Sequence, residues 1–587
     1  MKNISEMFHT MNFKPPILFV GIVAVASLLS FNAARAANYN WDGQAGNGLW
    51  SSANNWSSNI TVTAADGAQF SNAYGSGGQT ISLGGANQTL SQLLIANTTT
   101  AGLVTLNNGR LVIDASGASG FSPSAAVNWS GTANSTFTID ADVELKSNGT
   151  TNTYFYTRPG AAASTPTLSL GGNIQITNDT TTTQYLFRFG ANPASVIQKS
   201  GSVISDDGTT ESTLIISFAG SNQTATLNGA NTFTLAGGTS VRLTGTGGTL
   251  NLSNNAALGA TTNNVNSGDT AVTNSTDLRS ILITGNQTIQ NSFNITTSSG
   301  LTTIGGSNTS GNATYAGTIA LNRHASAANN VTYLTAAAGG TVLFTGNLTA
   351  GTGNGTSGVE KIGVGTTVLS GVNTYTGGTA VTSGTLLINN ATGSGLGTGN
   401  VTVSGGTLGG TGSFTGSVMI NSGGTLAPGA SIQSLASGAV SFATGSTFAY
   451  ELDSGVATSV GADLQRVSGN LSLTGTVTLT LANLSVGTFA ENTKFTLINY
   501  NGSWNNGLFT FNSNLLADDS TFSFNGQTWQ IDYNASSGGS NFSTEFLPSS
   551  SYVNLTVVPE PSTWALLAAS LTALMVFQRR KFSLPQE

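Results

Sequence analysis

Short segments of alternating apolar residues, separated by glycine, repeat along this chain at a nearly constant spacing. Gly-Thr-Leu triplets begin at Gly384, Gly406 and Gly424, so they recur about every 20 residues. A period of this size in strand-forming sequence fits one coil of a β-solenoid. Because a single coil cannot bury its own apolar face, many coils must follow one another. The sequence therefore predicts an all-β fold, an elongated parallel β-helix.

The strands themselves are short and alternate in polarity. Val401 and Val403 flank Thr402, and Val418 and Ile420 flank Met419 in the same way. Alternate residues of a strand point to opposite sides, so these valines and isoleucine should face the core. Coils of about 20 residues between residues 37 and 436 would give roughly 20 coils and a rod on the order of 100 Å long.

Composition excludes several classes of function. Only 7% of residues are charged, 75 of 587 are glycine, and cysteine is absent. Thiol nucleophiles, thiolate zinc sites and disulfides are therefore excluded. The net charge is −7, which argues against nucleic acid as a partner because phosphate binding requires a basic face.

One unit of the repeat is especially clear. Residues 359–388 read VEKIGVGTTVLSGVNTYTGGTAVTSGTLLI, and residues 226–252 form a degenerate copy. Asn373 aligns with Asn231, Leu369 with Leu227, and Tyr375 with Phe233, all at the same offset. The sequence segments LSGVNTYTGGT and SGTLLI resemble the autotransporter-associated β-strand repeat, also called the passenger-associated transport repeat. The resemblance implies a right-handed parallel β-helix on a secreted, surface-exposed protein.

Residues 1–36 have the pattern of a secretory signal peptide. Lys2 and Lys14 precede an apolar stretch over residues 17–29, and the small residues Ala34 and Ala36 suit a signal peptidase that cuts after Ala36. We therefore expect an N-terminal signal helix and export of the chain from residue 37 onward.

Residues 558–587 have the pattern of a second sorting signal. A Pro-Glu-Pro tripeptide precedes an apolar run over residues 564–577, and a basic cluster follows. The arrangement resembles the PEP-CTERM sorting signal of Gram-negative bacteria, which implies an exosortase-type enzyme as partner. The run is shorter than the roughly 20 residues of a comfortable span, so we expect a single short, transient transmembrane helix. The predicted sorting residues are Pro559, Glu560, Pro561, Arg579, Arg580 and Lys581.

Three tryptophans lie near the start of the exported chain. Trp41, Trp50 and Trp56 follow one another within a short segment. A structural cap over the first coil explains this density, because the end of a stack exposes an unpaired edge. Sugar binding is the alternative, since aromatic faces stack on pyranose rings, and these three are then the candidate glycan-stacking residues. The pattern favours the cap.

The chain divides into a solenoid over residues 37–436 and a different region over residues 437–557. The second region has denser charges and longer alternating strands, which indicates a C-terminal β-rich cap or small sandwich-like module. Residues 534–551 are rich in serine, glycine and asparagine, and we expect them to be a loop and linker that lets the tail reach the membrane.

Candidate catalytic groups are sparse. His324 is the only histidine after the signal peptide, and no nucleophile elbow accompanies it. Asp140, Asp142 and Glu144 alternate with apolar residues, so one strand would place all three carboxylates on one face. Such oxygens are weak candidate ligands for calcium. An ordinary solvent-facing strand explains the same pattern, and we predict no catalytic residue and no required cofactor.

Two functions fit these observations. The first is a non-catalytic surface or extracellular-matrix protein, exported across the inner membrane of a Gram-negative bacterium and associated with exopolysaccharide. The second is a β-helical carbohydrate-active enzyme, a polysaccharide lyase or glycosidase, which would need carboxylates and a base in one groove. The scarcity of charge favours the first.

Overall fold

The computed structural model describes most of residues 38–559, together with residues 569–576 and 578. Within residues 38–559 the undescribed positions are 43, 46, 58–61, 63–65, 72–78, 97–103, 115–124, 130–135, 147–151, 158–164, 178–182, 191, 207–212, 236–239, 246, 268–278, 298–301, 324–329 and 352–355. The predicted signal peptide, including Ala34 and Ala36, lies outside the described residues, as does His324.

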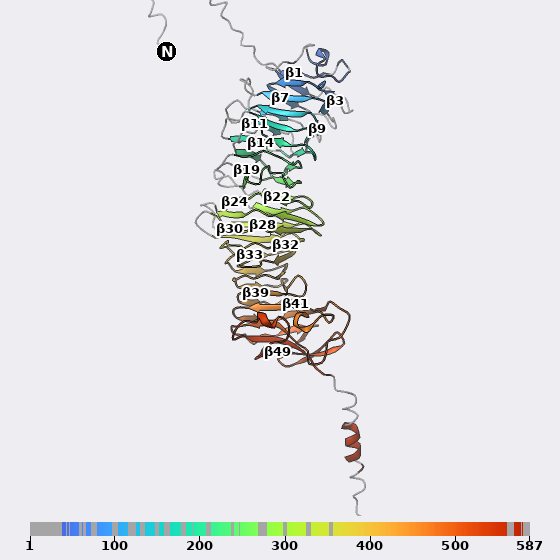
Figure 1. Ribbon diagram of the computed structural model, residues 1–587, viewed down its shortest axis with the longest axis vertical. Coiled ribbons are helices and arrows are strands. Elements are labelled where there is room, and N and C mark those ends of the chain that lie inside the picture. Colours follow the sequence, from blue (N-terminus) through green and yellow to red (C-terminus); the bar gives the residue numbers. More distant parts are fainter. Residues whose placement is uncertain are drawn as a thin grey trace, which may run out of the picture.

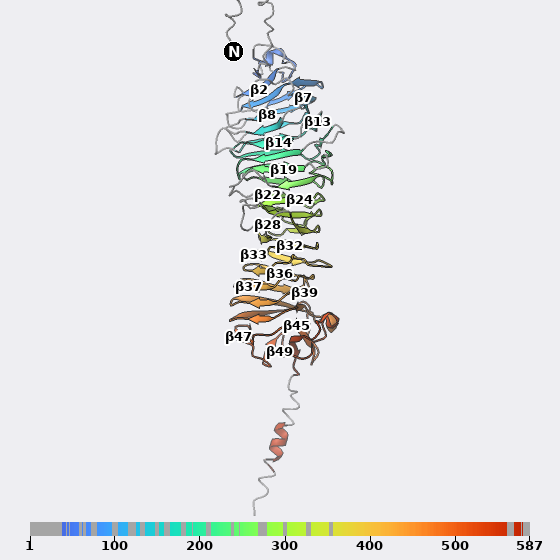
Figure 2. The same ribbon diagram turned by 90° about the vertical axis from the view of Figure 1, so that its left-hand side faces the viewer.

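The described chain forms an elongated stack of coils (Figure 1), and the view at right angles shows its strands as successive rungs (Figure 2). A typical coil has three strands, one in each of three parallel sheets that run along the rod. This arrangement confirms the predicted mostly-β, stacked parallel architecture. It follows from the sequence because each short strand is followed by residues that turn the chain toward the next face.

The first face is a twelve-stranded sheet. Its strands are β1 (Asn38–Asn40), β2 (Gly67–Ser71), β5 (Gln92–Ala96), β8 (Ala125–Trp129), β11 (Asn152–Thr157), β14 (Thr183–Phe189), β17 (Thr213–Phe218), β19 (Ser240–Gly245), β21 (Asn264–Ser267), β24 (Phe293–Thr297), β27 (Ile319–Arg323) and β30 (Leu348–Ala350).

The second face is a sixteen-stranded sheet and runs the full length of the stack. Its strands are β3 (Gln79–Ser82), β6 (Val104–Asn107), β9 (Thr136–Ile139), β12 (Thr167–Leu170), β15 (Ala194–Gln198), β18 (Gln223–Leu227), β20 (Thr249–Leu252), β22 (Arg279–Ile283), β25 (Thr302–Gly306), β28 (Asn330–Ala336), β31 (Ser357–Ile362), β33 (Thr379–Val381), β35 (Val401–Val403), β37 (Val418–Ile420), β40 (Val440–Phe442) and β43 (Leu471–Leu473).

The third face consists of a five-stranded sheet followed by an eleven-stranded one. The first contains β4 (Asn87–Leu90), β7 (Arg110–Asp114), β10 (Asp142–Lys146), β13 (Ile174–Thr177) and β16 (Ile204–Ser205). The second contains β23 (Thr288–Ile289), β26 (Asn312–Tyr315), β29 (Thr341–Phe344), β32 (Thr366–Leu369), β34 (Thr385–Ile388), β36 (Thr407–Gly410), β38 (Thr425–Pro428), β41 (Ser446–Leu452), β44 (Val477–Asn483), β46 (Phe509–Phe511) and β47 (Asn514–Leu515).

Coil length differs from the prediction over much of the rod. Val401 pairs with Val418, and Val418 pairs with Val440, so these two coils are close to the predicted length. Ile139, however, pairs with Leu170, which makes that coil much longer. The expectation of one short length for every coil is therefore wrong, because most coils carry a full first-face strand that the short coils lack. Sixteen strands have fifteen spacings of about 4.8 Å, so the second face is about 70 Å long, shorter than the rod predicted.

In the short coils, isolated backbone hydrogen bonds take the place of the first-face strand. Thr374 donates its N–H to the carbonyl of Leu348 over 2.9 Å, and Gly395 donates to Ser413 over 2.8 Å. Phe414 donates in turn to Ala436, on the strand where a sheet resumes on this side. These links keep successive coils in register although no strand forms there.

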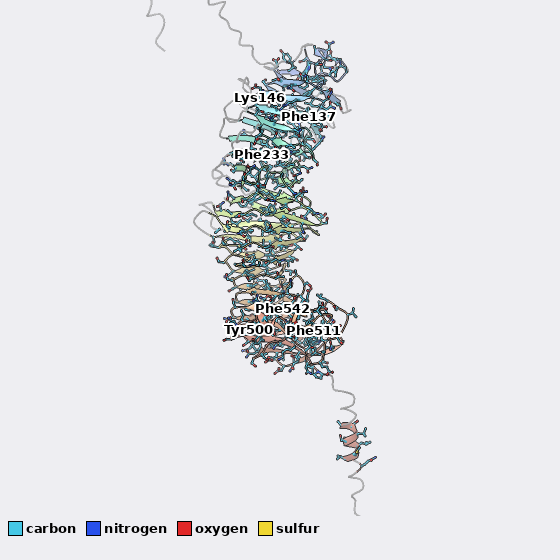
Figure 3. All side chains as sticks on the ribbon, viewed as in Figure 1. Phe137, Lys146, Phe233, Tyr500, Phe511 and Phe542 are labelled. Carbon is cyan, nitrogen blue, oxygen red and sulfur yellow. The ribbon has the colours of Figure 1, made fainter. Side chains whose placement is uncertain are left out.

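The core is a continuous column of inward-facing apolar side chains. Val401 and Val403 are buried while Thr402 is partly exposed, as the alternation predicts. Aromatic rings also stack from coil to coil, as Tyr315 and Phe344 do with centroids 5.1 Å apart. Each fully buried side chain of this size contributes roughly 1.5–3 kcal/mol by leaving water. Figure 3 shows side chains along the whole stack, with Phe137 and Phe233 labelled in its upper half.

The C-terminal sheet continues the stack and then changes direction. It has six strands: β39 (Ser434–Ser437), β42 (Leu464–Val467), β45 (Lys494–Tyr500), β50 (Ser551–Val557), β49 (Gln527–Ala535) and β48 (Thr521–Phe524). The first three pair in parallel, whereas β45 with β50, β50 with β49 and β49 with β48 are antiparallel. Parallel pairing on the second face continues past residue 436 to Leu473, so the coils run into the β-rich C-terminal region without a break. The described residues up to 559 also contain three short 3-10 helices: η2 (Ala53–Asn55), η4 (Thr458–Val460) and η5 (Ser543–Glu545).

Residues 534–551 are not the open linker that their composition suggests. β49 continues to Ala535, and Asn541 is fully buried. The Asn541 amide donates to the carbonyls of Asp463 and Thr496 at 2.6 and 2.9 Å. Polar side chains therefore tie this loop to the coils beneath it, and composition alone could not reveal those partners.

The chain leaves the C-terminal sheet after Val557. Residues 569–576 are helical, and no helix among the described residues combines the length and apolar character that crossing a membrane requires. Most of the predicted sorting segment, including residues 564–568 and 577, lies outside the described residues.

Candidate functional site

The three N-terminal tryptophans form one buried cluster at the start of the rod. Trp50 and Trp56 meet edge to face with centroids 4.8 Å apart, and Trp41 and Trp56 do so at 5.1 Å. The side chains are only 1%, 2% and 0% exposed for Trp41, Trp50 and Trp56. Rings this buried present no face to a sugar, so the glycan-stacking alternative does not fit the structure. The cluster instead covers the first coil.

Local hydrogen bonds hold this cap in place. The indole N–H of Trp56 donates to the carbonyl of Trp50 over 2.8 Å. Asn55 is fully buried, and its amide donates to Asn47 and to the carbonyl of Leu49. Because these bonds join residues within one short segment, the cap is a local fold that the Trp and Asn spacing encodes.

The acidic segment does not form the single strand that its alternation predicts. β9 ends at Ile139 and β10 begins at Asp142, so the chain turns a corner between two faces of the rod at Asp140 and Ala141. Asp140 therefore lies apart from Asp142 and Glu144, which occupy β10. The sequence could not distinguish a strand from a corner here because Ala141 is buried in either arrangement.

Each of these three acids is joined to another coil. Asp140 accepts a 2.6 Å hydrogen bond from the Lys199 ammonium, and Asp142 accepts one from the backbone N–H of Asn173. Glu144 lies 3.3 Å from the Arg110 guanidinium and 3.8 Å from the Lys146 ammonium. Their oxygens do not converge, so the proposed calcium cluster is not formed. Asp142 and Glu144 thus tie adjacent coils together, and Asp140 ties coils that are two apart.

A different group of acids converges near the C-terminal end. Oxygens of Asp518, Asp519 and Asp532 lie within 4.8 Å of one another. Burial, followed by the negative charges of Asp518 and Asp519, raises the pKa of the Asp532 carboxyl. Asp518 also accepts the backbone N–H of Tyr533, and Asp532 that of Asn534. The sequence analysis did not identify this group, because only the fold of the antiparallel strands brings Asp532 close to Asp518 and Asp519.

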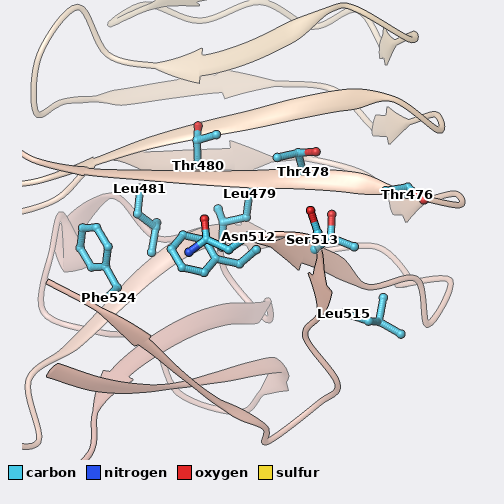
Figure 4. Close-up of a pocket in the computed structure, with 11 residues that line it drawn as sticks. Thr476, Thr478, Leu479, Thr480, Leu481, Asn512, Ser513, Leu515 and Phe524 are labelled. Carbon is cyan, nitrogen blue, oxygen red and sulfur yellow. The ribbon is translucent and has the colours of Figure 1, made fainter. Parts of the chain in front are cut away.

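A groove of about 840 Å³ lies beside β44 (Figure 4). No charged residue lines it, so it offers no general acid or base. Its walls are formed by Thr476, Thr478, Leu479, Thr480, Leu481, Thr510, Phe511, Asn512, Ser513, Leu515 and Phe524. We call it the β44 groove.

Two smaller hollows contain one carboxylate each. The first, about 300 Å³, lies beside β31, β33 and β35 and includes Glu360. The second, about 520 Å³, contains Glu491 and Lys494. A glycoside-cleaving site needs two carboxyl groups across one substrate bond, and none of these three cavities supplies that pair.

Two buried charges stand outside any of these cavities. Burial raises the pKa of Asp463 to about 8, although its oxygens accept backbone N–H bonds from Gln433 and Glu451. Burial also lowers the pKa of Lys361 to about 8. Neither group has a partner of opposite charge among its described hydrogen bonds, and both join backbone groups of successive coils.

Lys361 occupies a core position between Leu334 and Val381. Its ammonium donates to the carbonyls of Ile362, Gly363 and Ser383 at 2.8, 2.7 and 3.2 Å. The corner that receives it also requires Gly384, whose φ is +65° and where a Cβ would lie 2.4 Å from a backbone oxygen. Lysine thus stabilises a tight turn of the repeat.

Of the predicted sorting residues, the structure places only Pro559, which is exposed beyond the end of β50. Glu560, Pro561, Arg579, Arg580 and Lys581 lie outside the described residues.

Comparison with known families identifies one repeat. The passenger-associated-transport-repeat family matches residues 359–388. This segment begins within β31 and ends with β34, so it contains Lys361 and the buried Asn373. A search of curated proteins gives no match. The chain is therefore a parallel β-helix repeat protein that contains one segment similar to the passenger-associated transport repeat, and this repeat points to a secreted bacterial protein.

Proposed function

We propose that this protein is a non-catalytic surface or extracellular-matrix protein, an elongated rod that adheres to or organises exopolysaccharide. The observation that supports this most directly is that the few acidic side chains singled out in the sequence form contacts within the rod. Asp140, Asp142 and Glu144 bind groups on other coils and do not converge on a site.

The rod surface suits contact with a neutral or weakly charged polymer. Outward positions on the second face follow one another as Thr402, Met419, Ser441 and Ser472 from β35 to β43. Hydroxyl groups can donate to and accept from sugar hydroxyls without the cost of desolvating an ion. A repeated surface of this kind provides many equivalent weak contacts along a polymer, which add through multivalency.

In this proposal the two terminal segments direct the export and processing of the chain. Signal peptidase would remove residues 1–36, and the tail would hold the chain transiently in the inner membrane. An exosortase-type enzyme would then recognise Pro559, Glu560 and Pro561. The exposure of Pro559 just beyond β50 supports this step, because a processing enzyme needs an accessible segment.

The test is size-exclusion chromatography of the purified chain with bacterial exopolysaccharides, following protein and polymer together. Co-elution with a polymer of unchanged size is the expected result. A variant with Arg110→Gln and Glu144→Gln serves as a matched control, since it removes the closest ion pair on the third face while leaving the Thr and Ser surface intact, and it should co-elute as well. If the wild-type chain shortens the polymer, the carbohydrate-active-enzyme alternative replaces the proposal.

A further inference from the structure

Two loops at the C-terminal end of the rod expose several large apolar side chains. The first loop, residues 453–461, follows β41, and the second, residues 484–490, follows β44. Single exposed apolar residues are common on protein surfaces, but a group of them marks a surface that contacts another molecule or a membrane. The group here consists of Val456, Val460, Leu484 and Val486, which are 45%, 48%, 47% and 108% exposed.

Hydrogen bonds join the two loops to each other. The Asn483 side-chain oxygen accepts the N–H of Ser454 over 3.1 Å, and the Asn483 amide donates to the Ser454 hydroxyl over 3.1 Å. The Ser485 hydroxyl donates to the Asp453 carboxylate. These bonds hold the loops side by side, so we treat residues 453–461 and 484–490 as one surface and call it the apolar loop pair.

The end of the second loop is fixed to the C-terminal sheet. Phe489 is 7% exposed and packs edge to face against Phe495 and Trp529, with ring centroids 5.4 Å apart in both pairs. The Gln527 side chain donates to the carbonyl of Phe489 and accepts its N–H, each over 2.7 Å. Because these contacts fix the loop, Val486 is held outside the core.

The chain leaves the rod close to this surface. Asn525, in the turn between β48 and β49, donates its side-chain amide to the carbonyl of Gly487 over 2.7 Å. Thr528, farther along the same hairpin, accepts the N–H of Val558 over 2.9 Å. At most about 10 Å of chain separates Asn525 from Thr528. The second loop and the start of the tail therefore lie at the same end of the rod, where β49 is labelled in Figure 1.

The length of the tail limits how far this end of the rod can lie from a membrane. Six residues, 558–563, separate the rod from the apolar run of residues 564–577, and they span at most about 20 Å when fully extended. In the proposed function that run is held in the inner membrane. The apolar loop pair is then kept within reach of the same lipid surface.

We propose that the apolar loop pair rests on the lipid surface beside the tail, with Leu484 and Val486 inserted among the headgroups. This inference rests on the membrane-held state in the proposed function and extends it, because the contact sets how the rod stands on the membrane before processing. Apolar side chains on a protein surface enter the headgroup region in this way without spanning the bilayer.

The charges near the two loops fit a shallow contact. Asp453 is the one charged residue within the apolar loop pair, and Glu491 follows directly after it. The Asp453 carboxylate accepts the Ser485 hydroxyl and the N–H of Gly455, so it is bound within the loops. Because a carboxylate is costly in hydrocarbon, these two acids keep the loops at the level of the headgroups.

Lipid is the occupant because the tail brings this end of the rod to a membrane. The described part of the tail does not cover the loops itself, since every residue of the helix over residues 569–576 is exposed. The apolar loop pair is thus available to the surface in which the tail is held.

The absence of cysteine allows one fluorescent label at a chosen position. The full chain with Val486→Cys, labelled with an environment-sensitive dye, is reconstituted into phosphatidylethanolamine and phosphatidylglycerol vesicles with or without nitroxide-bearing lipid. Its emission should be blue-shifted, and the nitroxide should quench it. Val364→Cys is the matched control. This valine is 67% exposed in the turn between β31 and β32, so its label should be neither shifted nor quenched.

A charge placed in the loop gives a second measurement. In a chain labelled through Leu484→Cys, Val486→Asp should reduce quenching by the nitroxide, because the carboxylate opposes insertion, whereas Val364→Asp should leave it unchanged. Melting curves check that both variants are folded. Quenching that Val486→Asp does not reduce would show that insertion does not hold the loop.

The remaining outcomes separate this proposal from the proposed function. If the chain floats with the vesicles but the Val486→Cys label is not quenched, or is quenched no more than the Val364→Cys label, the loop contact is overturned and the tail anchor stands. A chain that does not float with the vesicles overturns both the loop contact and the membrane step of the proposed function. Loss of polysaccharide binding with the quenching intact would count against the adhesive role alone.

Discussion

Asn231 and Asn373, at equivalent positions of the two repeat copies, make the same pair of hydrogen bonds between coils. The side-chain oxygen of Asn231 accepts the N–H of Ile204 at 2.8 Å, and its amide donates to the carbonyl of Ala257 at 2.7 Å. Asn373 accepts from Leu348 and donates to Gly395 at 2.7 and 2.6 Å. Both side chains are buried, so each one links the preceding coil to the following coil.

Replacing Asn373 by alanine should destabilise the repeat. The N–H of Leu348 and the carbonyl of Gly395 would lose their partner in a buried environment, at a cost of about 1–3 kcal/mol for each group. Chemical denaturation monitored by circular dichroism measures the loss. The control is Asn400→Ala at an exposed position, which should change the free energy of unfolding by less than about 0.5 kcal/mol. Equal stability of the two variants would refute the bridging role.

Lys361→Met should also destabilise the chain, because three carbonyls lose the ammonium that binds them. The lowered pKa of Lys361 also determines how the stability of the chain changes with pH. The pKa of Lys361 is about 8 in the folded chain and 10.5 unfolded, so the unfolded state binds more protons between these values. The advantage of wild type over the methionine variant should grow between pH 8 and 10.5. A difference in unfolding free energy that stays constant with pH would show that burial does not lower the pKa of Lys361.

For Asp463 we expect the opposite trend: its contribution to stability should fall as pH rises, and it should do so at lower pH than for Lys361. Its folded pKa of about 8 exceeds the ordinary value of 3.8, so the folded state retains a proton that the unfolded state has lost. Stability linked to this group is fully present below about pH 4 and is lost as pH rises toward 8. The slope approaches about 1.4 kcal/mol per pH unit.

Thermal unfolding of Asp463→Asn checks this trend. The amide cannot titrate, so the variant should show a flatter profile between about pH 4 and 8, although its NH2 group faces a backbone N–H and lowers overall stability. Glu491→Gln, at an exposed position, should leave the profile unchanged. Parallel profiles for wild type and Asp463→Asn would exclude Asp463 as the source.

Removal of one cap ring separates a structural role from sugar binding. Trp56→Ala should cost about 3–5 kcal/mol, and the loss should be concentrated in the first coils because a solenoid is stabilised by neighbour contacts. Hydrogen exchange of β2 and β5 should therefore accelerate while β40 stays protected. Leu49→Ala, at a side chain 40% exposed, is the control. Uniform acceleration along the rod would contradict a local cap.

Processing at the tail can be tested by mass. In a host that contains an exosortase, replacing Pro559, Glu560 and Pro561 by alanine should leave the chain intact to its last residue, whereas the wild-type chain should be shortened. Pro548→Ala, at an exposed proline before β50, should be processed normally. If the wild-type chain and the tripeptide variant end at the same residue, the exosortase does not recognise this segment.

Much of the fold could be predicted from local pattern. The alternation at Val401 and Val403 requires a strand with one buried side, and the alignment of Asn373 with Asn231 identified equivalent positions in different coils. The cap was also local, since Trp50 and Trp56 meet within one short segment. These features depend on residues close in sequence or on a repeat that the sequence displays.

Coil length and the acidic segment could not be predicted in this way. Nothing local distinguishes a corner at Asp140 from a strand that continues through it, because the turn is fixed by pairing with Leu106 and other residues of the adjacent coil. The partners of Asp140 and Glu144 are Lys199 and Arg110, which lie one or more coils away.

The sequence by itself determined that this chain stacks short strands into a parallel β-helix, because alternation and glycine spacing are local and a single coil cannot bury its own face. The tertiary structure alone decided which edges are covered. Asn373 covers the end of β30, whereas on one side of β44 the pairing with β46 stops after Thr478. Edge pairing depends on where a distant strand stops, and no residue within β44 encodes that.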